Sequence, residues 1–487
     1  MIHVSDLLHI KRCDSYCWNS KYKHKEFQNQ YHGDIPFYKI WTEFLGLNEY
    51  EIGQTGDSNE ISFEKLNKNS ILLMGRFEYN GCRTRIPLLE KIEEGYSVVY
   101  PFLSAYPKES EALIIKINDI ILNKLGIHVT KYYSIYLYKN YIRKEELDLH
   151  EMLRKSDFLF NRRNRPGRTI KECIEAFDFD LDQWIEYTKE ILSKSELIPV
   201  RHKQCTSSRR CIYYSDCFNE DRLEDDSVLF FTTSRYKLLD YNNGIRRICD
   251  IPFDHFDGFR LQYAQYMASK NGIFYDSAAL KTWMGEICYP ISYLDFEWDT
   301  FAIPPYTGMK PFDVLCFQYS LHVEEKDGCL KHEDFFEGGD CREHFIQSLI
   351  QKLPKEGSIL VYNMEGAEKL RLMQLAEQFP KYRNVLERIC SRMIDLSKPF
   401  EAGLFYDNRM RGHYSLKNIL PVFTDDYSYA QLSIQSGTNA VQAYRMFEKA
   451  DEEAKKEIRE SIRKYCCMDT FAEYVVFHGL IHILKED

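Results

Sequence analysis

The sequence predicts an α+β protein with more than one domain, and three observations support this prediction. The 487 residues exceed the usual length of one domain. Hydrophobic residues make up 44% and aromatic residues 15% of the chain, which is enough for sizeable cores and argues against general disorder. Short apolar runs typical of strands occur beside segments of helical periodicity, and their order changes along the chain.

Three regions differ in this pattern. Residues 1–235 mix helical segments with strand-like runs such as TKYYSIYLY, and residues 171–194 predict one long amphipathic helix. Residues 236–285 predict a mostly helical connector. In 286–487 the strand-like runs YPISYLDF, DVLCFQYSLHV and GSILVYN give way to helical segments, the last of which starts near Asp451. Strands followed by helices predict a mixed sheet covered by helices in this C-terminal domain.

Charge and cysteine content limit the kind of protein. The net charge is −10 at pH 7, so a nucleic-acid site, if present, must be local. No apolar run reaches about 18 residues and the first residues lack a signal-peptide core, so we expect a cytoplasmic protein without a membrane partner. In such a protein the 15 cysteines indicate free thiols or metal ligands before disulfides.

Two carboxylates lie close together in the strand-like run ISYLDFEWDT. Asp295 and Glu297 are two residues apart, so in a strand their side chains point to the same face. Like charges this close repel each other unless something neutralises them. A divalent metal ion is the usual solution in proteins, which makes this strand a candidate metal site.

Further acidic residues follow in an order that fits such a site. Glu368 comes after the later strand GSILVYN, near the start of a helix, and Glu365 is its rival for the same position. Tyr465 and Asp469 are four residues apart in the last helix and therefore share one helix face. The chain thus offers an acidic strand, an acid at a strand-to-helix junction, and a helix with a tyrosine and an acid.

Five strings over residues 287–485 carry a family resemblance: YLDFE, VYNMEGAE, MIDLSKPF, YSLK and YCCMDT. In this order they resemble a bacterial domain-of-unknown-function family within the DEDD exonucleases of the ribonuclease H-like superfamily. That group has a DxE strand, an acid after a later strand, and a C-terminal helix with YxxxD. The resemblance implies a ribonuclease H-like domain and a 3′→5′ exonuclease that acts on DNA or RNA.

The same resemblance implies roles for individual residues. It implies four metal ligands, which are Asp295, Glu297, Glu368 and Asp469. Two Mg²⁺ or Mn²⁺ ions held by such oxygen ligands activate a water molecule and stabilise the leaving oxygen. Tyr465 would position the attacking water or help to activate it. Glu368 departs from the aspartate usual in this group, and Gly366 and Ala367 stand where relatives tend to have a bulkier residue.

A second constellation is formed by cysteines in HKQCTSSRRCIYYSDCF. Cys205, Cys211 and Cys217 are spaced C-x5-C-x5-C, so they cannot all share one helix face and a loop must gather them. Three thiols need a fourth ligand. Cys13 and Cys17 near the N-terminus are the candidates.

One distant cysteine followed by a trio resembles the iron–sulfur RecB-type nucleases, whose domains are restriction-endonuclease-like (PD-(D/E)XK). SDLLHIKRC is similar to the opening of that family, with Cys13 at the position of the first ligand, so Cys13 is preferred to Cys17. The resemblance implies that four thiolates hold a [4Fe–4S] cluster. Zn²⁺ is the alternative occupant, because four thiolates also suit a tetrahedral zinc ion.

The nuclease residues of the RecB-type family are not matched. Where the family has R-x-D, this chain has Arg85, Ile86 and Pro87, and a proline cannot bind a metal. The following strand, VVYPF, contains neither the acid nor the lysine that the family uses. The N-terminal domain is therefore predicted to keep the fold and the cysteine cluster but to be catalytically degenerate.

A basic segment in the N-terminal domain could still contact nucleic acid. Residues 154–172 hold seven lysines and arginines around Phe158 and Phe160. Basic and aromatic side chains together suit phosphate contact and base stacking. A solvated loop that happens to be basic is the alternative interpretation.

Two functions are compatible with these patterns. The first is a metal-dependent exonuclease with nucleic acid as its partner, DNA before RNA, and the intact DxE and YxxxD patterns favour it. The second is a catalytically inactive nucleic-acid-binding or scaffold protein, favoured by the degenerate RecB-type residues and the unusual second acid. An electron-transfer enzyme is disfavoured, because no GxGxxG loop follows a predicted strand.

Overall fold

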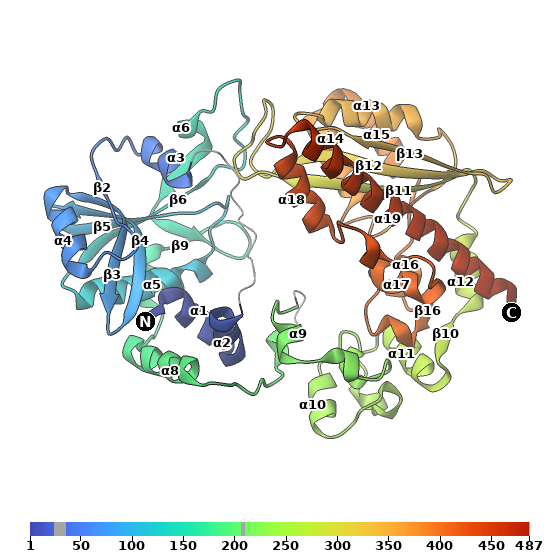
Figure 1. Cartoon of the computed structure of the whole chain (residues 1–487), viewed down its shortest axis with the longest axis horizontal. Helices are drawn as coiled ribbons and strands as arrows, with labels where there is room; N and C mark the ends of the chain where they lie inside the picture. Colours follow the sequence, from blue (N-terminus) through green and yellow to red (C-terminus); the bar gives the residue numbers. More distant parts are fainter. Residues whose placement is uncertain (24–35, 206–209, 487) are drawn as a thin grey trace. The chain divides into compact units, whose positions relative to one another are not determined.

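The computed structural model describes residues 1–23, 36–205 and 210–486 (Figure 1). The chain forms two compact units: the first comprises Met1–Glu220 with Phe301–Phe312, and the second comprises Asp221–Thr300 with Asp313–Asp487. Strands and helices occur in both units, which confirms the predicted α+β class. The segment 236–285, expected as a connector, belongs to the second unit. No helix within the described ranges has the length and apolar character needed to cross a bilayer.

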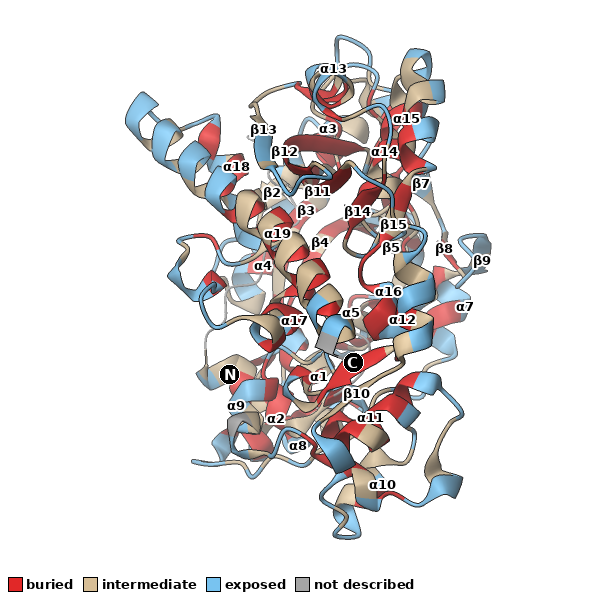
Figure 2. Cartoon of the chain, turned by 90° about the vertical axis from the view of Figure 1, so that its right-hand side faces the viewer, coloured by how far each residue is buried: buried red, intermediate tan, exposed pale blue. Residues whose placement is uncertain are grey.

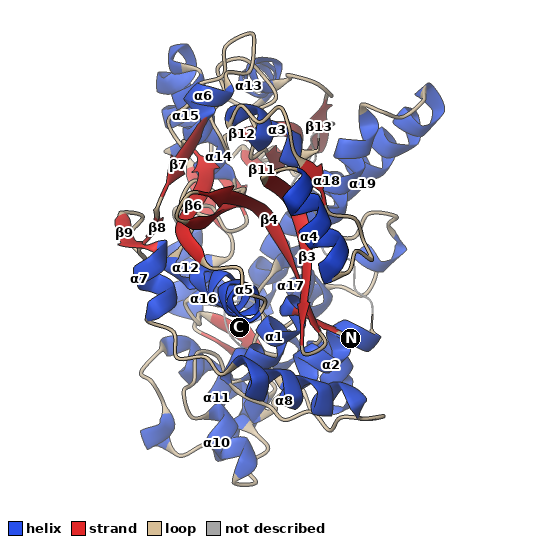
Figure 3. Ribbon diagram, turned by 90° about the vertical axis from the view of Figure 1, so that its left-hand side faces the viewer, coloured by secondary structure: helices blue, strands red, loops and turns tan. Residues whose placement is uncertain are grey.

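The first unit is built on a seven-stranded sheet with the order β2-β3-β4-β5-β6-β7, in which β1 also pairs with β4 (Figure 3). Its strands are β1 (Ile2–His3), β2 (Glu51–Ile52), β3 (Ile71–Tyr79), β4 (Cys82–Ile92), β5 (Gly95–Pro101), β6 (Val129–Leu137) and β7 (Leu153–Ser156). The chain runs antiparallel from β3 to β5, whereas β5 and β6 are parallel because a helix connects them. A separate pair is formed by β8 (Phe158–Phe160) and β9 (Pro166–Thr169).

Helices cover both faces of this sheet and create two apolar cores. One core takes residues from α1 (Val4–Arg12), α2 (Asp14–Tyr22), α4 (Asn59–Lys68), α5 (Ala112–Lys124), α7 (Ile170–Glu175) and α8 (Leu181–Ser193). The other takes residues from α3 (Phe37–Phe44), α6 (Leu149–Met152) and the segment Phe301–Phe312. The short helix α9 (Tyr214–Cys217) follows near the end of the unit.

The prediction of one helix over 171–194 is wrong, because two helices occupy this stretch. Thr169 caps α7 through its side chain, and Asp180 caps α8 by accepting the backbone N–H of Gln183 at 3.1 Å. An aspartate in this position satisfies a free backbone donor at a helix start and favours a new helix over continuation of the old one. The periodicity of the apolar residues did not reveal this break.

The second unit contains a five-stranded sheet with the order β13-β12-β11-β14-β15. Its strands are β11 (Ile291–Thr300), β12 (Val314–Glu324), β13 (Leu330–Phe336), β14 (Ile359–Val361) and β15 (Met393–Asp395). β11, β12 and β13 are antiparallel, whereas β14 is parallel to both β11 and β15. The predicted mixed sheet is therefore confirmed, with β13 as an additional strand that the polar sequence LKHEDFF did not predict.

Helices bury both faces of this sheet. On one face an apolar core includes residues of α13 (Arg342–Lys352), α14 (Glu368–Gln378) and α15 (Arg383–Cys390). On the other face lie α18 (Gly437–Phe447) and the long α19 (Glu452–Glu486) (Figure 1). As a result β12 is buried at every position, and Figure 2 shows it in the interior with β11.

The remaining elements of the second unit are mostly short. They are α10 (Lys237–Asn242), α11 (Arg260–Asn271), β10 (Ile273–Tyr275), α12 (Ser277–Met284), α16 (Lys398–Glu401), β16 (Phe405–Asp407) and α17 (Leu416–Phe423). β10 pairs with β16, and Gln265 on α11 donates to the hydroxyl of Tyr406 at 3.1 Å. These contacts explain why the expected connector packs as part of the second unit.

Candidate metal centre

The strand β11 places its acidic residues on one face and its apolar residues on the other. Leu294 and Phe296 belong to the apolar core beneath α13, α14 and α15. Asp295 lies on the opposite face, where the thiol of Cys466 on α19 donates to its Oδ2 at 3.3 Å. The alternation of the sequence thus separates the core from the candidate site, as expected for a strand.

Three of the predicted ligands come together in the structure. One carboxylate oxygen each from Asp295, Glu297 and Asp469 lies within 4.8 Å of the others. Glu297 and Asp469 are each only 7% exposed. Burial, followed by the neighbouring carboxylates, raises the pKa of Asp295 and Glu297 well above the usual range, and burial raises the pKa of Asp469 to about 6. Such a set of buried like charges is stable as anions only beside a cation.

Of the two candidates for the second acid, Glu368 lies near the acidic group and Glu365 does not. Glu368 is the first residue of α14, is 1% exposed, and has an Oε2 atom that is buried without a hydrogen-bond partner. Burial and then the charge of Asp295 raise its pKa well above the usual range. Glu365 instead forms an ion pair with Lys369 at 2.6 Å near the surface. Glu368 lies beside the group of three carboxylates but outside its 4.8 Å limit.

Two tyrosines face Asp469. Tyr429 donates its hydroxyl proton to Oδ1 of Asp469 at 2.6 Å. Tyr465 is 4% exposed, and burial followed by the charge of Asp469 raises its pKa far above the ordinary value. Both phenols therefore stay protonated and act as hydrogen-bond donors toward the acidic cluster. The sequence pattern indicated Tyr465 but not Tyr429.

One cation belongs to the same site. Nζ of Lys417 lies 4.9 Å from the ring centroid of Tyr465 and 5.1 Å from that of Tyr429. Its charge counters the increase in pKa of Asp295, Glu297 and Asp469. Lys417 is the last residue of YSLK, a string that took part in the family resemblance without a role of its own.

A fifth carboxylate was missed by the sequence analysis. Glu473 lies one helical turn after Asp469 on α19, is 1% exposed, and has both carboxylate oxygens buried without hydrogen-bond partners. Burial and then the charges of Asp295, Glu368 and Asp469 raise its pKa well above the usual range. Its spacing offered a signal, because Tyr465, Asp469 and Glu473 are each four residues apart and lie on one helix face.

The helix α18 closes the site beside Glu297. Arg445 on α18 makes two contacts of 2.6 Å with the carboxylate of Asp299 and so fixes the helix against β11. Gly437 is the first residue of α18 and lies close to Glu297, so that a Cβ added to it would be 3.3 Å from Oε2 of Glu297. A larger residue there would crowd the carboxylate, and the positive end of the helix dipole favours a negative group.

We expect Glu473→Gln to lower the affinity of the protein for Mn²⁺ by about 10–100-fold, because one negative charge leaves the cluster. The shape of the side chain is kept, so the fold is expected to persist. Calorimetric titration of Mn²⁺ into the full-length protein measures this change. Glu457→Gln, at an exposed position of the same helix, is the matched control. Equal affinities in the two variants would remove Glu473 from the site.

The four predicted cysteine ligands of the first unit line one cavity. They are Cys13, Cys205, Cys211 and Cys217. Burial raises the pKa of the Cys217 thiol to about 11, with further increases from Cys13, Cys211 and Cys205. Asn19 also donates to the sulfur of Cys217 at 3.3 Å. The structure thus brings the distant Cys13 to the trio.

Cys17, the rival fourth ligand, has a different environment. It is fully buried, and its thiol donates to the carbonyl oxygen of Asp6 at 3.4 Å. It takes part in the apolar core with α1 and does not line the cavity.

The spacing of the four cysteines bears on the two possible occupants. Among the described residues, the groups of three or more ligand atoms that lie within 4.8 Å of one another do not include these cysteines. Thiolates around one tetrahedral zinc lie only about 3.8 Å apart, given a Zn–S distance of about 2.3 Å. The four thiols together are therefore spaced more widely than the ligands of one zinc ion.

The acidic residues near the unmatched RecB-type positions do not form a second acidic site among the described residues of the first unit. Pro87 lies within β4, and Glu90 on the same strand accepts a hydrogen bond from Ser97 at 3.0 Å. Glu109 pairs with Arg168 at 3.2 Å. Among the described residues of the first unit, no three metal-ligating side chains lie as close as those of the second unit.

The basic segment 154–172 runs from β7 through the β8–β9 hairpin into α7. Arg162, Arg163 and Arg165 are exposed in its turn. Phe160, expected as a possible stacking surface, is 6% exposed and packs edge-on against neighbouring aromatic rings. The arginines of this hairpin are therefore accessible for contact with phosphate groups, whereas the ring of Phe160 is too buried for a base to stack on it.

A comparison with protein families gives one match, most of which lies in the second unit. Residues 292–415 match a domain of unknown function (DUF2779). The expected similarity to a domain-of-unknown-function family is thereby confirmed for this segment, which includes Asp295, Glu297 and Glu368. Comparisons with curated proteins and with solved structures gave no match.

Proposed function

We propose that the second unit is a metal-dependent 3′→5′ exonuclease that hydrolyses phosphodiester bonds in nucleic acid, DNA before RNA. The observation that carries this proposal is the approach of Asp295, Glu297 and Asp469 to within 4.8 Å. Two divalent ions in such a site supply an activated water and stabilise the leaving oxygen. The direction of cleavage is what the resemblance to the DEDD exonucleases implies.

The donor set fits Mg²⁺ or Mn²⁺. These ions prefer carboxylate oxygens and are held less well by nitrogen or sulfur donors. Buried oxygen atoms of Glu368 and Glu473 have no hydrogen-bond partner, so they are available as ligands. The five carboxylates carry up to five negative charges, and Lys417 offsets only one of them. Two divalent cations would offset most of the remaining charge.

Tyr465 and Lys417 would act on the substrate rather than on the metals. A phenol that stays protonated cannot be a general base at neutral pH, but it can donate a hydrogen bond that orients the attacking water or a phosphate oxygen. The Lys417 ammonium, near the rings of Tyr465 and Tyr429, is placed to counter the negative charge of a bound phosphate.

The first unit would bind a [4Fe–4S] cluster through its four cavity cysteines, with Zn²⁺ as the alternative. In this proposal it is a catalytically degenerate RecB-type domain that helps to hold the substrate. The exposed arginines of the β8–β9 hairpin support contact with the phosphate backbone.

A second candidate is an inactive nucleic-acid-binding or scaffold protein. The position of Glu368 outside the group of three carboxylates is the observation that favours it. A cleavage assay with full-length, anaerobically purified protein separates the two functions. The substrates are single- and double-stranded DNA and RNA labelled at either end, with Mn²⁺ present. Stepwise shortening from the 3′ end supports the exonuclease, whereas binding without cleavage supports the scaffold.

Cys13→Ser is expected to remove the iron–sulfur absorption near 400 nm and to lower the iron content of the purified protein, because one of four thiolate ligands is lost. Cys17→Ser is the matched control, since serine can keep the hydrogen bond to the Asp6 carbonyl. Iron and sulfide analysis of anaerobic preparations measures the effect. Iron lost from Cys17→Ser but kept in Cys13→Ser would reverse the assignment, and zinc in place of iron would favour the alternative occupant.

A further inference from the structure

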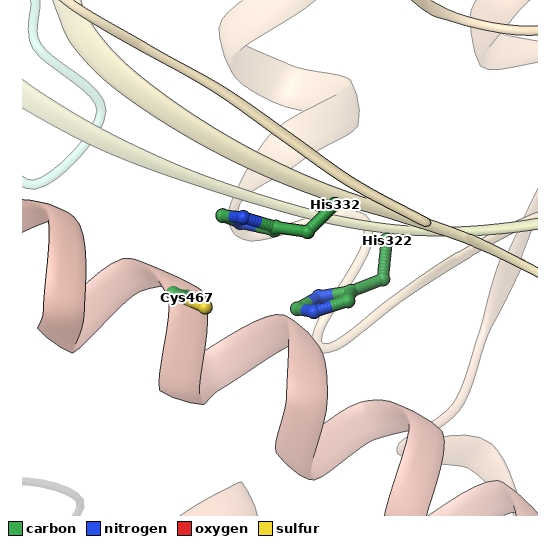
Figure 4. A group of neighbouring side chains, drawn as sticks. All are labelled: His322, His332 and Cys467. Atoms are coloured by element: carbon green, nitrogen blue, oxygen red, sulfur yellow. The ribbon is translucent and has the colours of Figure 1, made fainter. Parts of the chain in front are cut away.

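A separate group of nitrogen and sulfur donors lies on the β12–β13 strand pair of the second unit (Figure 4). His322 and His332 are directly opposite each other in the antiparallel ladder, so both rings lie on one face of the sheet. Their ring centroids are 4.4 Å apart. Cys467 on α19 lies beside them, and one ligand atom from each of the three residues lies within 4.8 Å of the other two.

Hydroxyl groups orient both imidazoles. Nδ1 of His322 is 2.8 Å from Oγ1 of Thr470, and Nε2 of His332 is 2.9 Å from Oγ of Ser320. The two hydroxyls are themselves 2.7 Å apart, and Thr470 can donate to the carbonyl oxygen of Cys467 at 3.2 Å. With protons on His322 Nδ1 and His332 Nε2, every member of this chain has a partner.

This arrangement leaves a lone pair on the second ring nitrogen of each histidine. Histidines that bind metals usually donate their other ring N–H to a nearby oxygen, which fixes the orientation of the ring. Burial lowers the pKa of His322 to about 4, so its imidazole is neutral at neutral pH. Neutral imidazole is the form that binds a metal ion.

Open space adjoins two of the three residues. A cavity of about 510 Å³ is lined by His332 and Cys467 together with Asp334, Arg463 and Phe471, among others. A metal ion at this position would have a free coordination site toward the cavity, available to water or to a small ligand.

We propose that His322, His332 and Cys467 bind one Zn²⁺ ion, separate from the carboxylate centre. Two imidazoles and a thiolate are donors that suit zinc, whereas Mg²⁺ and Mn²⁺ prefer the oxygen ligands of the other site. Donors around a tetrahedral zinc lie about 3.3–3.8 Å apart, so the observed group needs only a small contraction. Three protein ligands and an open fourth position form a plausible coordination set.

The ion would link three elements of the fold. His322 is on β12, His332 on β13 and Cys467 on α19, so zinc ties the helix to the sheet. The same helix carries Tyr465 and Asp469 within one turn of Cys467. Zinc at this position is therefore expected to hold the catalytic face of α19 against the strands without itself contacting the carboxylates.

Zinc content and Co²⁺ spectra of the full-length protein test this site. The test variants are Cys467→Ser and His332→Gln, and the matched controls are Cys329→Ser and His344→Gln at exposed positions. After passage over a chelating resin and reloading with Zn²⁺, the wild-type protein and controls are expected to hold one zinc equivalent more than either test variant. Any metal at the first-unit cysteines contributes equally to all samples.

Co²⁺ gives an independent measurement, since a cobalt–thiolate bond absorbs in the near ultraviolet. This band is expected in the wild-type protein and in Cys329→Ser, and its intensity should fall in Cys467→Ser. His332 lies exposed on the edge strand β13, so its substitution is tolerated by the fold, which circular dichroism verifies. Identical zinc content and identical cobalt spectra in wild type and both test variants would overturn the proposal, whatever the result of the nuclease assay.

Discussion

Asp295→Asn is expected to slow 3′-end cleavage by at least about 10³-fold, which corresponds to about 4 kcal/mol of transition-state stabilisation. Asp295 lies within 4.8 Å of Glu297 and Asp469, so it is one of the three clustered carboxylates that would hold the proposed ions. Asparagine keeps the shape and can still accept the hydrogen bond from Cys466, but it lacks the charge that binds a cation. Initial rates of 3′-nucleotide release with Mn²⁺ measure the effect.

The stability of the same variant distinguishes a lost ligand from a lost fold. Without metal, Asp295→Asn should unfold at a higher temperature than the wild type, since a buried charge beside like charges has been removed. Added Mn²⁺ should stabilise the wild type and have little effect on the variant. Glu365→Gln, just before α14, is the control and should retain both cleavage and the response to Mn²⁺. Full activity of Asp295→Asn would rule out the carboxylate site as the nuclease.

The metal-free protein is expected to become less stable as the pH rises from about 4 past 6, which is opposite to ordinary acid denaturation. The pKa of Asp469 is about 6 in the folded protein and 3.8 in its unperturbed state, so the folded state binds this proton more tightly. The resulting stabilisation is fully present below pH 3.8 and is lost as the pH rises through 6. For Asp469 alone it is on the order of 3 kcal/mol.

Several groups contribute to this dependence with the same sign. The pKa values of Asp295, Glu297, Glu368 and Glu473 are also raised by burial, and the charge of Lys417 opposes the change at Asp295 and Glu297. Denaturant unfolding from pH 4 to 8 in EDTA, with Asp469→Asn as reference, isolates the Asp469 contribution. With saturating Mn²⁺, the free energy of unfolding of the wild type and of Asp469→Asn should depend on pH with the same slope, because the metal replaces the protons. A wild type whose stability in EDTA rises over this range relative to Asp469→Asn would contradict the buried cluster.

The strand alternation and the helix spacing were enough to indicate most of the acidic site. Asp295 and Glu297 share a strand face, and Tyr465 and Asp469 share a helix face, and these periodicities are local. Glu473 extends the same helical spacing and could have been found by following it one more turn. Tyr429 could not be found in this way, because it lies in a separate short 3₁₀-helix, Tyr429–Gln431, and no periodicity relates it to Asp469.

The fold was predictable where apolar patterns were continuous. β11 and β12 are flanked by helices on both faces and are buried at almost every position, and their long runs of apolar and aromatic residues signalled strands. The edge strand β13 has a partly exposed, polar sequence and gave no such signal. The break between α7 and α8 depends on the Asp180 cap, a single hydrogen bond that periodicity does not register.

The segment Phe301–Phe312 has a consequence for dividing the protein into fragments. It lies in the chain between β11 and β12, yet it belongs to the first unit, where Ala302 is 7% exposed in the core with α3. A fragment that begins at Asp221 would contain all five carboxylates of the acidic group. It would also contain Phe301–Phe312 without the first-unit core against which this segment packs. Separate expression of the second unit therefore calls for a short polar turn in place of Phe301–Phe312, whereas cutting the chain there would separate Asp295 from α19, which carries Asp469.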